Sequence, residues 1–304
     1  MSLRDLRDSG WAVRAVTLQR LVDLEAAFED LLLGGLLTPR VYEECAQYFS
    51  FALPERSSEA HSLVIGARLS PKVRVEFELE TGRRLYTVPP QYHGHEAVAA
   101  EALALLAQRD HERAFEVEVA ELPMKLLGAC SGLGLYGRNN LLYVAGMGSF
   151  HQLAAFYTDE TCLEETWDEP LAMTRCQDCT ACMKACPTGA IVRDRFLLKM
   201  ERCLTLFNEE SGEFPEWIEP SAHNCPVGCL RCQIVCPENR DVADVVGATV
   251  VFDANETAAL LAGATAERLA PDLLERLRSA GLSDYLSVLP RNLAVLADPE
   301  AEAL

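Results

Sequence analysis

The stretch "RCQDCTACMKACPTGAI", residues 175–191, places four cysteines close together and follows the last of them with a proline. A second run, "NCPVGCLRCQIVCPENR", occupies residues 224–240 and contains the same Cys-Pro pair. Three cysteines separated by two residues each, with a fourth before proline, are the bacterial ferredoxin pattern. The two runs therefore predict two 4Fe-4S clusters. A zinc ribbon, which uses four ligands as two separated pairs, fits them less well.

The same pattern assigns ligands, because the cysteine before proline ligates the neighbouring cluster. It gives the first cluster four cysteines: Cys176, Cys179, Cys182 and Cys236. The second cluster receives Cys186, Cys229 and Cys232. Its fourth ligand is either Cys225 or Cys203, which lies in a helical-looking stretch between the runs. Spacing alone leaves both alternatives open.

Composition bounds the class of protein. A chain of 304 residues with 49% hydrophobic content predicts about two globular domains. The N-terminus shows no secretory signal, and the longest apolar run, Leu31–Leu37, is too short for a membrane span. A cytoplasmic location without membrane contact is therefore expected, where twelve cysteines indicate metal or redox chemistry. The net charge of -19 disfavours nucleic acid as a partner.

Hydrophobic periodicity predicts an α+β protein. Residues 11–37 suggest one long helix, 61–69 a buried strand, and 73–89 a hairpin around Thr81-Gly82. A helix over 96–109 and strands over 115–120, 140–146 and 150–159 follow. The expected domains are a cofactor-binding domain over 1–170, a double-cluster domain over 171–245 and a helical C-terminal segment over 246–304.

A glycine-rich stretch, "SGLGLYGRNNLLYVAGMGSF" at 131–150, suggests a backbone that approaches a ligand closely. A pair of structural turns explains the same composition. The stretch lacks the strand-to-helix layout of a dinucleotide fingerprint. The candidate cofactor-binding residues are Gly132, Gly134, Tyr136, Gly137, Arg138, Asn139, Asn140, Tyr143, Gly146, Gly148, Ser149 and Phe150.

The order of "SGLGLYGRNN", "GSF", "YTD", "CQDCTACMKACPTGAI", "RCLTLFNEE" and "GCLRCQIVCPENR" resembles the epoxyqueuosine reductase family, whose core is related to reductive dehalogenases. The resemblance runs from about residue 60 to 300 and indicates a short, divergent subgroup. It implies a nitroreductase-like α/β corrinoid-binding domain joined to a ferredoxin-like double-cluster domain, with cobalamin against the glycine-rich stretch. It also implies that Cys203 ligates the second cluster and that Cys225 is extra.

The resemblance is weaker at the proton donor. The family's aspartate precedes the "GLG" motif, where this chain offers Glu116, Glu118 and Glu121. Burial could raise the pKa of a glutamate enough for general acid catalysis, although a salt bridge is the more ordinary role. Glu118, Tyr136 and Arg138 are the candidate catalytic residues, with Tyr143 a further candidate; packing and ion pairing are the competing roles of these tyrosines and of Arg138.

The leading functional expectation is a corrinoid-dependent reductase. An external donor such as ferredoxin or flavodoxin would supply low-potential electrons, which two clusters pass to the corrinoid for reduction of a small organic substrate. One alternative is an electron-transfer protein that reduces a corrinoid or flavin on a partner. The other is epoxyqueuosine reduction in tRNA, which the acidity of the chain disfavours.

Overall fold

A computed structural model describes residues 3–107, 118–159, 161–162, 164–194 and 196–298. The chain forms two compact units, each assembled from separate stretches of sequence. The first unit contains residues 1–69, 95–179 and 193–199, and the second contains residues 70–94, 180–192 and 200–304. This interleaved division differs from the contiguous boundaries expected near residues 170 and 245. Helices and strands occur in both units, which confirms the α+β class.

The first unit is built on a sheet with the strand order β1-β2-β8-β5, in which every neighbouring pair is antiparallel. The strands are β1 (Ala12–Thr17), β2 (Ser62–Leu69), β5 (Glu118–Val119) and β8 (His151–Thr158). The central strands β2 and β8 are apolar and buried on both faces. Gly66 is required in β2, because a Cβ there would lie 2.8 Å from the Trp11 ring.

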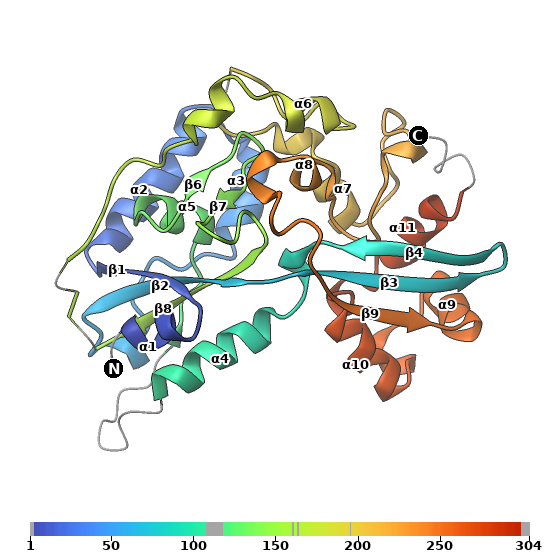
Figure 1. The fold of residues 1–304 in the computed structure, drawn as a ribbon, viewed down its shortest axis with the longest axis horizontal. Coiled ribbons are helices and arrows are strands. Elements are labelled where there is room, and N and C mark those ends of the chain that lie inside the picture. Colours follow the sequence, from blue (N-terminus) through green and yellow to red (C-terminus); the bar gives the residue numbers. More distant parts are fainter. Residues whose placement is uncertain (1–2, 108–117, 160, 163, 195, 299–304) are drawn as a thin grey trace. The chain divides into compact units, whose positions relative to one another are not determined.

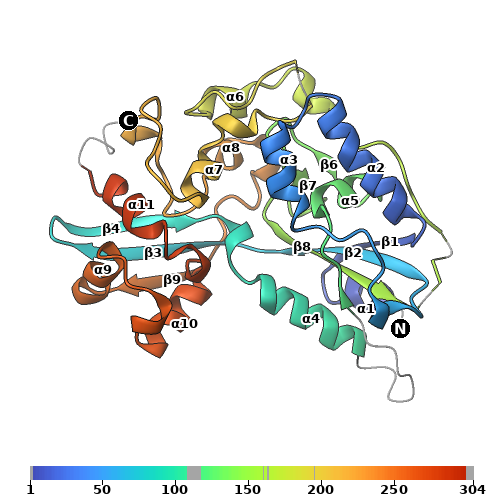
Figure 2. The same cartoon turned by 180° about the vertical axis from the view of Figure 1, so that it is seen from behind.

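Helices cover both faces of this sheet, as Figures 1 and 2 show from opposite sides. On one face, α1 (Leu3–Asp8) and α4 (His95–Ala107) pack around Trp11, Val64 and Phe156. On the other face, α5 (Met124–Cys130) contacts β2 and β8, and α2 (Arg20–Leu33) packs on α5. The remaining elements are α3 (Pro39–Ala46), η1 (Glu55–Ser57), η3 (Thr174–Gln177) and the short hairpin β6 (Leu135–Tyr136) and β7 (Leu142–Tyr143).

The second unit contains the sheet β4-β3-β9, formed by β3 (Lys72–Leu79), β4 (Gly82–Val88) and β9 (Val246–Phe252). Strands β3 and β4 are an antiparallel hairpin, whose turn uses Gly82 at φ 113°. Strand β9 pairs with β3 in parallel. Along β3 the residues alternate, so that Val73, Val75 and Phe77 face a common core.

Three helices from the end of the described chain pack on this core (Figure 1). They are α9 (Ala254–Leu261), α10 (Pro271–Ser279) and α11 (Leu289–Leu296). Asp253 and Glu256 form a capping box at the start of α9, which satisfies two backbone N–H groups there. The cysteine-rich segments of this unit form only short elements: α6 (Ala181–Ala185), η4 (Met200–Arg202), α7 (Leu204–Glu209), η5 (Pro220–Ala222), α8 (Arg231–Ile234) and η6 (Pro237–Asn239). The unit also contains the short elements η2 (Pro90–Tyr92), η7 (Ala266–Arg268) and η8 (Ser283–Tyr285).

Two expectations about secondary structure were wrong. Residues 12–17 are strand β1 and not the start of a long helix, because β-branched Val13, Val16 and Thr17 pair along the edge of β2. Residues 246–252 are strand β9, although the C-terminal segment was expected to be helical. The strands over 61–69 and 150–159 and the hairpin around Gly82 are confirmed. Within the described part of the chain, no helix has the length and apolarity to cross a bilayer.

Candidate metal centre and glycine-rich loop

Three of the predicted cluster ligands share one backbone conformation. Cys186 (φ -72°, ψ 112°) and Cys236 (φ -73°, ψ 124°) each precede a proline, which disfavours the helical conformation at the residue before it. Cys203 (φ -73°, ψ 125°) is extended in the same way at the start of α7. Each of these cysteines therefore lies at the edge of a short helical element and not within it.

The two runs of cysteines meet at α6, from the first run, and α8, from the second, which pack against each other in the second unit. Cys182 lies in α6 and Cys232 lies in α8. Among the described residues, no cysteine is joined in a disulfide, and no three His, Cys, Asp or Glu side chains gather as they would around a single metal ion.

The Cys203 thiol is influenced electrostatically by two other predicted ligands of the second cluster. Burial raises the pKa of its thiol, and the charges of Cys229 and Cys186 raise that pKa further. The backbone N–H and hydroxyl of Thr205 act in the opposite direction by donating to the sulfur. Leu204 also belongs to the apolar cluster against which Cys229 packs. A thiol donor set of this kind fits a 4Fe-4S cluster.

Cys225, the alternative ligand, is fully buried and has a different partner. Its Sγ donates a hydrogen bond to Oδ1 of Asn224 at 3.1 Å. Burial raises the pKa of this thiol well above its usual value, and the neighbouring Cys229 raises it further. Cys225 is thus hydrogen-bonded to Asn224, whereas the pKa of the Cys203 thiol responds to the charges of both Cys186 and Cys229.

In the first unit, Arg138 holds the segment that carries Cys176. Its backbone N–H donates to Sγ of Cys176 at 3.4 Å. Its guanidinium donates to the carbonyl oxygen of Cys176 and, at 2.6 Å, to that of Arg193. These contacts anchor the chain at a predicted cluster ligand, which is a structural role for a residue predicted to be catalytic and cofactor-binding.

The glycine-rich stretch packs tightly on itself. A Cβ on Gly134 would lie 2.5 Å from the carbonyl oxygen of Tyr143, and one on Gly137 would lie 2.5 Å from the Tyr143 ring. Gly132, Gly146 and Gly148 instead adopt positive φ angles. Asn140 also has a positive φ, and Arg138 is half-buried. The remaining polar and aromatic side chains predicted to bind cofactor are buried: Tyr136, Asn139, Tyr143, Ser149 and Phe150. The chain itself therefore fills the space at Gly134 and Gly137, while a Cβ on Gly146 would meet no other atom within 4 Å.

The buried Oδ1 of Asn140 and Nδ1 of His151, in and beside this loop, have no hydrogen-bond partner among the described residues. Nε2 of His151 lies 3.0 Å from the carbonyl oxygen of Leu142, which can only accept, so Nε2 carries the proton. Burial lowers the pKa of His151 to about 4.

The candidate proton donors are placed as follows. Tyr136 is buried with its ring against Phe196, and burial raises the pKa of its hydroxyl. It therefore keeps its proton throughout the physiological pH range. Glu118 lies in strand β5, where its backbone is opposite Tyr157. Glu116 lies outside the described residues.

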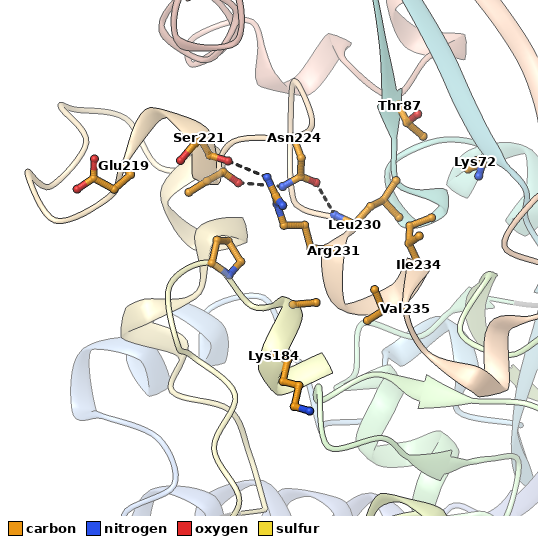
Figure 3. A pocket seen from close by; sticks show the side chains of 13 residues that line it. Lys72, Thr87, Lys184, Glu219, Ser221, Asn224, Leu230, Arg231, Ile234 and Val235 are labelled. Atoms are coloured by element: carbon orange, nitrogen blue, oxygen red, sulfur yellow. Dashed lines mark hydrogen bonds between the residues drawn. The ribbon is translucent and has the colours of Figure 1, made fainter. Parts of the chain in front are cut away.

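A pocket of about 640 Å³ in the second unit was not anticipated from the sequence (Figure 3). Its polar wall includes Lys72, Lys184, Arg231 and Glu219, and its apolar wall includes Ile234 and Val235. Arg231 donates to the carbonyl oxygen of Ser221 at 2.7 Å. Lys184 and Arg231 lie beside cysteines in the sequence, but Lys72 is distant in sequence and reaches the same pocket only in the folded chain.

Comparisons with known proteins agree with this arrangement. Residues 175–239 match the family described as the 4Fe-4S double cluster binding domain. An epoxyqueuosine reductase from Cellulophaga algicola is 37% identical over 129 residues, which are 42% of this chain and 40% of that protein. An epoxyqueuosine reductase from Escherichia coli is 34% identical over 125 residues, which are 41% of this chain and 32% of that protein.

Over these segments the chain is similar to epoxyqueuosine reductases. It carries a double 4Fe-4S cluster binding domain, as the cysteine spacing predicted. The aligned segment spans less than half the length of either curated relative. The fold agrees over a longer stretch: epoxyqueuosine reductase from Streptococcus thermophilus has a TM-score of 0.65 at 18% identity, with 98% of this chain and 81% of that chain covered.

The expected partners need correction. A solved epoxyqueuosine reductase, 20% identical with a TM-score of 0.52, is in complex with an epoxyqueuosine-modified stem loop of tRNA-Tyr; the match covers 79% of this chain and 64% of that one. The expectation of a small-molecule substrate, with nucleic acid disfavoured, is therefore wrong. Net charge sums the whole surface, whereas phosphate contacts depend on local charge. The pocket shows such local charge, with three cationic side chains and one carboxylate.

Proposed function

We propose that this chain is an iron–sulfur oxidoreductase that reduces epoxyqueuosine in tRNA. The observation that carries the proposal is the pair of cysteine runs within residues 175–239, which match the double-cluster domain. When bound, two 4Fe-4S clusters supply two one-electron carriers. Removal of an epoxide oxygen as water consumes two electrons and two protons. Two clusters that each carry one electron match this requirement.

In this proposal the second cluster is held by Cys186, Cys203, Cys229 and Cys232. The first is held by Cys176, Cys179, Cys182 and Cys236, as the ferredoxin spacing predicts. Thiols must lose their protons to bind metal. Burial opposes that loss at Cys203 and Cys229, and hydrogen bonds from Thr205 and Asn224 favour it.

The proposal includes a corrinoid bound by the glycine-rich loop of the first unit. Its support is the resemblance to the family, the unpartnered Oδ1 of Asn140 and Nδ1 of His151, and the open space beside Gly146. Gly134 and Gly137 would shape this loop, because the chain occupies the space beside them. When bound, a corrinoid supplies a cobalt centre for one-electron chemistry. Tyr136, which keeps its proton, would orient a bound group as a hydrogen-bond donor.

The tRNA would contact the pocket of the second unit through its phosphates. Lys72, Lys184 and Arg231 provide the positive charge, and Glu219 is the single acidic residue in the lining. Lysine and arginine supply most of the sequence-independent affinity for a phosphate backbone. This local site supports nucleic-acid binding by a chain that is acidic as a whole.

The test is a reaction under anaerobic conditions. Reconstituted protein, a chemical reductant and an epoxyqueuosine-containing tRNA stem loop are incubated with and without cobalamin, and the nucleosides are then analysed by mass spectrometry. We expect the modified nucleoside to lose one oxygen only when cobalamin is present. The variant Cys203→Ala should lose this activity. Failure of the fully reconstituted protein with cobalamin would contradict the proposed reaction, and activity without cobalamin would contradict the corrinoid alone.

A further inference from the structure

The Asn224 side chain connects two cysteines with the backbone of the second unit. Its Oδ1 accepts from the backbone N–H of Leu230 at 3.0 Å and from Sγ of Cys225 at 3.1 Å. Its Nδ2 donates to Sγ of Cys229 at 3.2 Å and to the carbonyl oxygen of Ala222 at 3.1 Å. Figure 3 shows the amide turned toward Leu230 at the wall of the pocket.

The orientation of this amide follows from its partners. The N–H of Leu230 can only donate, and the carbonyl of Ala222 can only accept. Oδ1 must therefore face Leu230 and Nδ2 must face Ala222, which leaves the second N–H of Nδ2 for the sulfur of Cys229. The network thus fixes an N–H donor on a predicted cluster ligand.

The surroundings strengthen this contact. Cys229 is half-buried and packs against Leu204, Ile218 and Ala222. In such an apolar environment a hydrogen bond to a charged sulfur is stronger than it would be in water.

We propose that Asn224 is a positioning residue that raises the reduction potential of the cluster ligated by Cys229. Reduction adds one electron to the cluster and increases the negative charge on its thiolate sulfurs. An N–H donor to such a sulfur stabilises the reduced state more than the oxidised state. The inference deepens the proposed function and rests on Cys229 being a cluster ligand.

The same network gives Cys225 a role that does not involve metal. Its thiol donates to Oδ1 of Asn224, while Nδ2 of the same amide donates to the sulfur of Cys229. A buried partner of this kind fixes the amide in one orientation. Cys225→Ala removes that donor, whereas Cys225→Ser retains one.

The experiment measures the midpoint potentials of both clusters by redox titration followed by electron paramagnetic resonance. The variants are Asn224→Leu, which removes the donor without adding charge, and Asn224→Asp, which retains an acceptor for Leu230. Ser221→Ala, in the same pocket wall, is the control, because its backbone carbonyl still accepts from Arg231. We expect both Asn224 variants to make the potential of one cluster more negative, with the other cluster and the control unchanged.

A second measurement uses the unaltered protein, so that the inference stays testable if a variant loses iron. Asparagine labelled with ¹⁵N only in its side-chain amide is incorporated, and the reduced protein is examined by pulsed electron paramagnetic resonance. We expect a ¹⁵N coupling to one cluster. Absence of this coupling, or unchanged potentials in iron-replete Asn224→Leu, would overturn the inference. An unaltered iron content in Cys229→Ala would instead show that the proposed ligand set is wrong.

Discussion

The backbone N–H of Arg138 donates to the sulfur of Cys176 at 3.4 Å, while the Arg138 guanidinium binds the carbonyl oxygen of the same cysteine. One residue of the glycine-rich loop therefore holds both the main chain and the side chain of a predicted cluster ligand. A substitution at Arg138 removes only the guanidinium contacts, since every residue except proline retains the backbone donor.

We expect Arg138→Ala to lower the free energy of unfolding by about 2 kcal/mol, because carbonyl groups that were bonded to a charged donor lose it. The first cluster should also lose iron faster under air. Arg138→Lys should restore little of the lost stability or iron retention, since a lysine cannot reproduce two separate guanidinium contacts. Chemical denaturation and iron release measure both effects. A variant with normal stability but lost activity would indicate the catalytic role predicted from the sequence.

The ligand choice at the second cluster is tested by a pair of cysteine variants. Cys203→Ala should lower the iron content from about eight toward about four atoms per chain, because one cube loses a thiolate. Cys225→Ala should leave about eight, since its sulfur is bonded to Asn224. Iron analysis after anaerobic reconstitution decides between them. The opposite outcome would make Cys225 the ligand.

His151 predicts a loss of stability in acid. Its pKa is about 4 in the folded chain, against an ordinary value of 6.5. Above pH 6.5 the imidazole is neutral in both the folded and the unfolded state and has no effect. As the pH falls from 6.5 to about 4, the unfolded state binds the proton first, which removes about 3 kcal/mol of stability.

The variant His151→Gln should reduce this acid sensitivity, because its amide can still donate to the Leu142 carbonyl but does not titrate. Denaturation midpoints between pH 4.5 and pH 7, compared for the two proteins at roughly matched ionic strength, measure the difference. Parallel curves would show that His151 contributes nothing to the pH dependence.

The charge of Lys184 is predicted to matter for RNA. Lys184→Glu should weaken binding of a tRNA stem loop and reduce the slope of log affinity against log salt by about one. Filter binding at several salt concentrations measures both quantities. Lys199→Glu is the matched control, since Lys199 does not line the pocket. Equal effects of the two substitutions would indicate general electrostatics and not a contact at this pocket.

The close packing at Gly134 predicts a steric effect. Gly134→Ala places a Cβ against the Tyr143 carbonyl and should lower the free energy of unfolding by about 1 to 3 kcal/mol. Gly146→Ala adds a methyl group in open space and bears only the cost of a positive φ, about 1 kcal/mol. Thermal unfolding compares them. A larger loss at Gly146 would contradict the packing seen here.

The sequence predicted features that depend on local spacing. The cysteine runs indicated the double-cluster domain because ligand spacing is a local property, and the alternation in β3 and β4 indicated their hairpin. Strand β1 was missed because short apolar runs fit both a helix and a strand, and pairing with β2 decided the outcome. Asn224 was overlooked because its contacts with Cys229 and Leu230 appear only after folding, although its place at the start of the second run was visible.

The charge argument failed for a related reason. The net charge of the chain does not show where the charged side chains lie in the fold. The pocket combines Lys72 from β3 with Lys184 and Arg231 from the cysteine-rich segments. The role of Arg138 shows the same limit, since composition indicated a polar group in the loop but not the carbonyl groups that it binds.

The parallel pairing of β9 with β3 has a consequence for biosynthesis. β3 leaves the ribosome long before β9, and every cysteine of both runs emerges between them. Strand β3 therefore cannot pair with β9 while the metal-binding segments are being synthesised, and its apolar residues stay unpaired on that side. Such a delay is typical of folds whose paired strands are distant in sequence. Iron supply during translation would thus act on a chain whose second sheet is still incomplete.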